Sequence, residues 1–138
     1  MTKYPEPTVG ALIVNAKGEI LLAESPKWKG GYTIPGGHIE LGETIEHAVK
    51  REVKEEVGIN VELKKVLFVQ EAIFSKRFYK KKHFIFLECV CEAKTNNIKL
   101  DNREMTSFFW ITPEKALKLK LEGFTRNFIV EYLKYIKA

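Results

Sequence analysis

The sequence has few of the features that mark secreted or membrane proteins. Only two cysteines, Cys89 and Cys91, occur in 138 residues. On a strand both would point to the same face, so we expect them to pack in the core rather than form a disulfide. No run approaches ~18 apolar residues, and no apolar stretch follows positive charge near the first residue. These absences predict a cytoplasmic protein that does not cross a membrane.

The composition gives no indication of disorder, repeats or linkers. Hydrophobic residues make up 45% of the chain and charged residues 30%, which is an ordinary globular balance. A chain of 138 residues can build one packed core. We therefore expect a single domain over residues 1–138, present as a monomer or homodimer.

The net charge of +5 comes largely from one basic stretch, SKRFYKKKHF, between residues 75 and 84. One interpretation is a solvated loop, and the other is a basic lip that attracts a phosphorylated ligand. No second basic cluster or known nucleic-acid motif accompanies this stretch, so nucleic acid is not the expected partner.

The pattern along the chain mixes strands with two or three helices. A helix is predicted from about 43 to 57, ended by Gly58, and Thr112 with Pro113 is typical of a short helix start. Thr125 is placed to cap a final helix. Strands are predicted in the stretches TVGALIV, EILLAES, VELKKVLFVQEAIF, HFIFLECVCEA and SFFWIT. This mixture predicts one layered domain of the α/β (α+β) class.

The predicted helix at 43–57 has carboxylates on its apolar face. At about 100° per residue, Glu52 and Glu56 point into the middle of that face, with Glu55 and Arg51 at its edge. The apolar face itself is formed by Ile45, Ala48, Val49 and Val53.

An unpaired buried carboxylate costs many kcal/mol, so these acids need a cation or water. Pairing with buried arginine or lysine is one explanation, but one arginine cannot neutralise three acids. A divalent metal is the other, because side chains three and four residues apart converge their oxygen atoms. Oxygen-rich sites with anionic substrates favour Mg²⁺, with Mn²⁺ able to substitute.

The same residues form a recognisable motif. Gly37, five residues, Glu43, seven residues and then REVKEEVGI resemble the Nudix box at every specified position. The stretch IPGG stands immediately before the box, and Glu104 precedes Trp110, as in many members of that family.

The resemblance implies a Nudix-type α/β/α sandwich, with a mixed β-sheet between helices. It implies a Mg²⁺-dependent pyrophosphohydrolase that cleaves a nucleoside triphosphate or another nucleoside diphosphate derivative and releases a nucleoside monophosphate. The implied metal ligands are the Gly37 carbonyl, Glu52, Glu55 and Glu56. Glu43, Arg51 and Gly58 would be structural residues of the box. Glu52 and Glu104 are the candidates for the catalytic base.

The substrate is less well indicated. Family members that favour ADP-ribose often carry a proline about sixteen residues beyond the box, and this chain has none there, so a nucleoside triphosphate is favoured. Candidate substrate-binding residues are Trp28, Tyr32, Arg77, Phe78, Tyr79 and Asn127. An RNA 5′-end pyrophosphohydrolase and a non-catalytic nucleotide-binding module remain as alternatives.

Overall fold

A computed structural model describes residues 4–24, 31–75, 82–94 and 107–138 of the chain. The strands are β1 (Glu6–Val14), β2 (Ile20–Glu24), β3 (Tyr32–Thr33), β4 (Gly36–His38), β5 (Val61–Ile73), β6 (His83–Ala93) and β7 (Ser107–Ile111). The helices are α1 (Ile45–Val57), α2 (Pro113–Ala116) and α3 (Gly123–Lys137).

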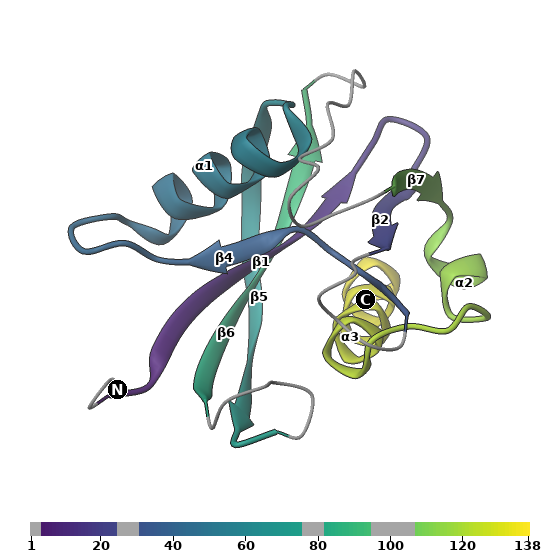
Figure 1. Cartoon of the computed structure of the whole chain (residues 1–138). Helices are drawn as coiled ribbons and strands as arrows, with labels where there is room; N and C mark the ends of the chain where they lie inside the picture. Colours follow the sequence, from purple (N-terminus) through teal and green to yellow (C-terminus); the bar gives the residue numbers. More distant parts are fainter. Residues whose placement is uncertain (1–3, 25–30, 76–81, 95–106) are drawn as a thin grey trace.

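The seven strands form one mixed sheet with β1 near its middle. The order of the main path is β3-β2-β1-β6-β5, while β4 pairs with β1 and β7 pairs with β2. β1 and β6 run parallel over nine residue pairs, from Glu6 opposite Phe84 to Val14 opposite Glu92. The other pairings are antiparallel, and α1 and α3 lie on opposite sides of the sheet (Figure 1). The predicted mixed sheet between helices is therefore confirmed.

Alternation along β1 divides the core into two halves. Ala11 and Ile13 point toward α1, and Leu12 points toward α3, since neighbouring strand residues face opposite sides of a sheet. On the α1 side these residues pack against Val49, Val53 and Val57, and on the α3 side against Phe128, Ile129 and Leu133. Both helices are thus held by apolar burial on one face.

Several local signals act as predicted. Gly58 ends α1 in the left-handed conformation, with φ of 80°. Thr112 caps α2, whose first residue is Pro113. Cys89 and Cys91 are both buried and form no disulfide. Within the described residues, none of the helices combines the length and apolar character needed to cross a membrane.

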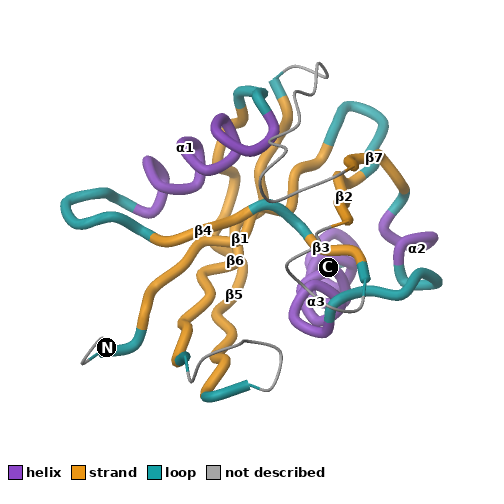
Figure 2. The backbone as a smooth tube through the Cα atoms, in the orientation of Figure 1, coloured by secondary structure: helices purple, strands orange, loops and turns teal. Residues whose placement is uncertain are grey.

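Two predicted helix starts are wrong. The first helix begins at Ile45 rather than 43, because the hydroxyl of Thr44 accepts a hydrogen bond from the backbone N–H of His47 at 3.0 Å. Glu43 therefore belongs to the loop between β4 and α1. Figure 2 draws this loop in teal. The last helix begins at Gly123, and its N-cap is Glu122 rather than Thr125.

Glu122 replaces the predicted cap because its longer side chain reaches two backbone donors. Its carboxylate accepts hydrogen bonds from the backbone N–H groups of Phe124 at 3.0 Å and Thr125 at 2.9 Å. The Thr125 side chain is then buried and contacts the Thr33 hydroxyl at 3.1 Å, which joins α3 to β3.

Replacing Glu122 with alanine removes these capping bonds. We expect Glu122→Ala to lower the free energy of unfolding by about 1 kcal/mol, the usual effect of losing an N-cap. Urea denaturation followed by circular dichroism measures this change. Lys118→Ala, at an exposed position before α3, is the control and should change stability by less than about 0.5 kcal/mol. Equal effects of the two substitutions would contradict the assignment of Glu122 as the cap.

Candidate active site

Helix α1 brings three carboxylates to different depths beside the sheet. The side chain of Glu52 is 15% exposed and that of Glu55 is 52% exposed, while Glu56 is almost fully buried. Helical periodicity explains the order, because Glu52 and Glu56 share the face that Val49 and Val53 press onto the sheet. The predicted inward direction of Glu52 and Glu56 is confirmed.

Arg51 joins this helix to the loop before it. Its Nε and Nη2 atoms donate to the two carboxylate oxygens of Glu43 at 2.7 and 2.8 Å. Nη2 also donates to the carbonyl oxygen of His38 at 3.0 Å. This two-point contact between a planar guanidinium and a carboxylate fixes direction as well as distance. The end of β4 and the start of α1 are thereby held together.

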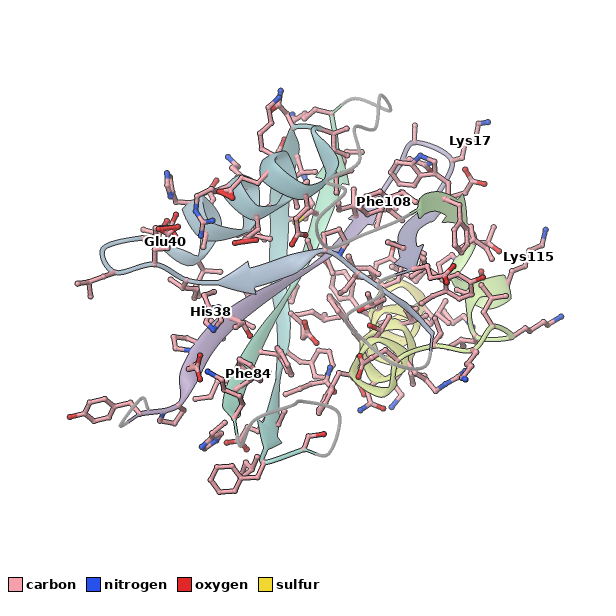
Figure 3. All side chains as sticks on the ribbon, viewed as in Figure 1. Lys17, His38, Glu40, Phe84, Phe108 and Lys115 are labelled. Carbon is pink, nitrogen blue, oxygen red and sulfur yellow. The ribbon has the colours of Figure 1, made fainter. Side chains whose placement is uncertain are left out.

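The third guanidinium nitrogen of Arg51 faces more acids. Nη1 donates to Glu52 at 2.9 Å and to Glu55 at 3.1 Å, and it lies 3.4 Å from a carboxylate oxygen of Glu40. Figure 3 shows Glu40 on the loop beside α1. One cation therefore faces four carboxylates, counting Glu43, and this region of the surface carries an excess of negative charge.

The hydrogen bonds from Arg51 lower the pKa of Glu43 to about 2. Glu43 also accepts hydrogen bonds from the backbone N–H of Glu40 at 2.8 Å and from the His47 ring at 2.6 Å. Conversely, Glu43, followed by Glu52 and Glu55, raises the pKa of Arg51 well above its ordinary value. Both side chains are consequently charged throughout the physiological range.

Two glycines of β4 allow the acids of α1 to approach the backbone. A Cβ atom at Gly37 would collide with the carboxylate of Glu52, so this carboxylate lies against the Gly37 α-carbon. The backbone N–H of Gly36 donates to Glu56 at 3.1 Å. A side chain at Gly37 would push Glu52 away from the strand, and one at Gly36 would collide with the Val9 carbonyl of the neighbouring β1.

The side chains that α1 brings to its junction with β4 and that could bind a cation are the carboxylates of Glu52 and Glu56. Within the described residues, no three histidine, cysteine, aspartate or glutamate side chains are gathered as a ready-made metal site. Two carboxylates beside a glycine backbone nonetheless suit Mg²⁺, which usually takes one or two carboxylates together with water and substrate phosphate. The Glu52 carboxylate lies against the Gly37 α-carbon, so a carboxylate and a glycine main chain are side by side, which fits such an ion.

The remaining predicted residues are spread over the molecule. Tyr32 packs edge-on against Phe109, with ring centroids 5.2 Å apart, and does not join the carboxylates. Asn127 is an exposed residue of α3 that donates a hydrogen bond to Gln70. Glu104, Trp28, Arg77, Phe78 and Tyr79 lie outside the described residues.

Sequence reasoning missed two polar residues that the structure buries on the α3 side of the sheet. Gln70 is 8% exposed and Glu88 is 4% exposed, and the Gln70 amide donates to the Glu88 carboxyl at 2.7 Å. The signal was present in the stretch HFIFLECV, where strand alternation places Glu88 on the same face as Phe86 and Val90. An acid in such a position requires a buried partner, just as Glu52 does on the other side.

Comparison with known proteins identifies a family and relatives that this chain resembles. The model of the NUDIX domain family matches residues 4–132. Nudix hydrolase 5 of Arabidopsis thaliana is 32% identical over 111 residues, which cover 78% of this chain and 36% of that protein. The NAD-capped RNA hydrolase NudC of Photobacterium profundum is 31% identical over 139 residues, which cover 99% of this chain and 50% of that protein.

A solved structure shares the fold over the whole length of this chain. A MutT protein from Methanosarcina mazei Go1 has a TM-score of 0.79 and 25% sequence identity, with 100% of each chain covered. The two curated relatives are longer, since this chain spans 36% and 50% of their lengths.

The contact between Glu43 and Arg51 predicts a specific pH dependence of stability. The pKa of Glu43 falls from an ordinary 4.5 to about 2 on folding, so its contribution is present above pH 4.5 and is lost as the pH falls toward 2. We expect Glu43→Gln to reduce the loss of stability across this window, measured by urea denaturation at a series of pH values. Glu46→Gln is the matched control, because Glu46 pairs with Lys50 on the exposed side of the same helix. If the pH profiles of Glu43→Gln and wild type coincide, the contact does not contribute in this way.

Proposed function

This chain belongs to the Nudix hydrolase family, and we propose that it cleaves the pyrophosphate linkage of a nucleoside triphosphate or related nucleoside diphosphate derivative with the help of Mg²⁺. One observation carries the proposal. Arg51 donates to Glu43 and thereby holds α1 beside β4. In this position the Glu52 carboxylate lies against Gly37, and the Glu56 carboxylate accepts a hydrogen bond from Gly36. The result is a cluster of oxygen atoms and excess negative charge beside a loop.

In this proposal, the Gly37 carbonyl, Glu52 and Glu56 would hold the metal, with Glu55 contributing directly or through water. Mg²⁺, when bound, would neutralise phosphate charge and make water more acidic. The donor set supports this choice of ion, because carboxylate and carbonyl oxygens are the ligands that Mg²⁺ prefers. Mn²⁺ takes similar ligands and is a suitable substitute in experiments.

The chain's own groups then perform the proton chemistry. A water molecule attacks one phosphorus atom of the pyrophosphate, the bridging P–O bond breaks, and a nucleoside monophosphate leaves. A carboxylate accepts the proton of the attacking water as general base. Glu52 is the candidate within the described residues, and Glu104 is the second candidate, so the assignment depends on comparing the two substitutions.

A second candidate substrate is capped RNA. The support is the 31% identity to a protein named NAD-capped RNA hydrolase, which extends over 99% of this chain. An NAD cap contains a pyrophosphate between two nucleosides, so the bond to be broken belongs to the same class. The two candidates are separated by comparing free nucleoside triphosphates, free NAD, NAD-capped RNA and triphosphorylated RNA. Hydrolysis of the RNA substrates alone would favour the second candidate.

The metal assignment is tested by Glu56→Gln, which keeps the shape of the side chain and removes its charge. We expect the affinity for Mn²⁺, measured by calorimetry, to fall by at least about tenfold, the minimum usual for disturbing a metal site. The free energy of unfolding without metal should stay the same or rise, because repulsion between neighbouring acids decreases. Glu46→Gln on the exposed face is the control. An unchanged affinity in Glu56→Gln would refute the assignment of Glu56 as a ligand.

The reaction is tested with Glu52→Gln. We expect kcat to fall by at least about a hundredfold, the usual minimum for loss of a general base. Glu104→Gln should cost less than Glu52→Gln if Glu52 is the base, and more if Glu104 is. The products are identified by chromatography, with excess chelator and Glu46→Gln as controls. Undiminished activity in chelator or in Glu52→Gln would overturn the mechanism.

A further inference from the structure

The strand β5 carries a cluster of apolar side chains that the structure leaves in solvent. Val66, Val69 and Ile73 of this strand are exposed, and so is Phe74, which directly follows it. The side chain of Val69, near the middle of the strand, is 52% exposed. Single apolar residues on a surface are common, but a contiguous group of them marks an interaction site.

The end of α3 adds apolar surface on the other side of the same strand. Tyr135 and Ile136 are exposed, and they follow the buried residues Tyr132 and Leu133 at helical spacing. The ammonium group of Lys65 lies 5.4 Å from the centroid of the Tyr135 ring, so this end of α3 is beside β5. Exposed apolar side chains therefore flank β5 on both faces of the sheet.

The position of β5 in the sheet leaves one of its edges open. The strand is the last in the order β3-β2-β1-β6-β5 and is paired along its inner edge with β6. Within the part of the chain that the structure describes, no strand pairs with its outer edge. A strand of 13 residues in this position presents a row of backbone N–H and C=O groups, which readily accepts a further strand.

An irregularity in β5 places two of the exposed valines on the same face. Val66 lies opposite Cys89 of β6 and Val69 lies opposite Leu87, and both of these β6 residues pack on the α1 side. Opposite residues of an antiparallel pair share a face, so Val66 and Val69 both point to the α1 side. In a regular strand, residues three apart face opposite sides, and here the register shift between Val66 and Phe68 restores the match.

This match makes the edge complementary to itself. A two-fold axis between Leu67 and Phe68 brings Val66 of one copy opposite Val69 of a second copy that runs antiparallel to it. Symmetry repeats the contact on the other side of the axis. A slip of one residue would put the two valines on opposite faces of the joined sheet.

The charges along the strand fit the same register. Lys64 and Glu71 are both exposed, and the two-fold axis that pairs the valines places Lys64 of one copy opposite Glu71 of the other. Opposite charges in facing positions stabilise a strand pair, whereas like charges destabilise it. A slip of two residues in either direction separates these charges as well as the valines. The pattern therefore favours a second copy of this chain as the occupant of the edge.

We propose that β5 is a self-association surface, on which a second copy of the chain pairs antiparallel with Val66 against Val69 and Lys64 against Glu71. The surface lies at the edge of the sheet, two strands away from β1, which pairs with β4. The inference therefore goes beyond the proposed function and is tested without measuring hydrolysis.

Sedimentation equilibrium over a wide range of concentration measures the association. We expect the mass to rise reversibly from 15.9 kDa toward twice this value. Val69→Lys should raise the dissociation constant of the dimer by at least about tenfold, because it buries a charge against an apolar side chain. Leu41→Lys changes an exposed apolar residue of the loop before α1 and is the matched control. A mass of 15.9 kDa at every concentration would overturn the proposal.

Exchanging the two charges tests the register. Lys64→Glu or Glu71→Lys alone places like charges opposite each other and should weaken the dimer several-fold, by about threefold to tenfold. The double variant restores opposite charges and should associate nearly as well as the wild type. Lys64 also lies 3.5 Å from Glu62 of its own strand, so circular dichroism checks that each variant folds. A double variant as weak as the single ones would contradict this register.

Cysteine substitutions give a second test that does not depend on charge. Facing positions of an antiparallel pair are close enough for a disulfide. An equimolar mixture of the Val66→Cys and Val69→Cys chains should therefore form a disulfide-linked dimer under mild oxidation, and each variant alone should form far less. Cys89 and Cys91 are buried and should not take part. Equal linkage in the single variants would show a different arrangement, and no linkage in the mixture would refute the pairing.

Discussion

The contact between Arg51 and Glu43 is the constraint on which the carboxylate site depends. Its two parallel hydrogen bonds, at 2.7 and 2.8 Å, tie the loop after β4 to the middle of α1. The same guanidinium holds the His38 carbonyl and touches Glu52. Because one cation serves several acids, it orders them without neutralising them. The site therefore combines fixed geometry with surplus negative charge, which is the state that a divalent cation stabilises.

Glycine makes this arrangement possible on both faces of the sheet. Gly37 lets Glu52 rest on the strand from the α1 side, and Gly10 lets Glu88 rest on the neighbouring strand from the α3 side, where a Cβ atom would meet its carboxyl. Gly10 and Gly36 are paired across β1 and β4. Acidic groups thus approach the same small area of backbone from opposite directions. Glycine at positions 10, 36 and 37 therefore lets a carboxyl group lie against the sheet on each of its two sides.

The sequence was sufficient for the inward acids because they depend on helical periodicity alone. Glu52 and Glu56 lie where a regular helix must place them, and Gly58 ends that helix for reasons of backbone conformation. The capping of α3 by Glu122 could not be predicted in the same way, because threonine is the more common N-cap residue. In the structure, the longer Glu122 side chain accepts a hydrogen bond from the backbone N–H of Thr125, and Glu122 is therefore the cap. The bond between Gln70 and Asn127 joins residues 57 positions apart, and no local pattern specifies it.

The contacts on the two sides of the sheet therefore depend on the sequence in different ways. The α1 side needs a fixed spacing of glycine, glutamate and arginine, because Arg51 must reach Glu43 across the loop and Glu52 must rest on Gly37. The α3 side carries Gln70, Glu88 and Asn127, whose spacing follows from strand pairing and helix docking rather than from a motif. The motif therefore identifies the family, whereas the contacts of Gln70, Glu88 and Asn127 become visible only in the folded chain.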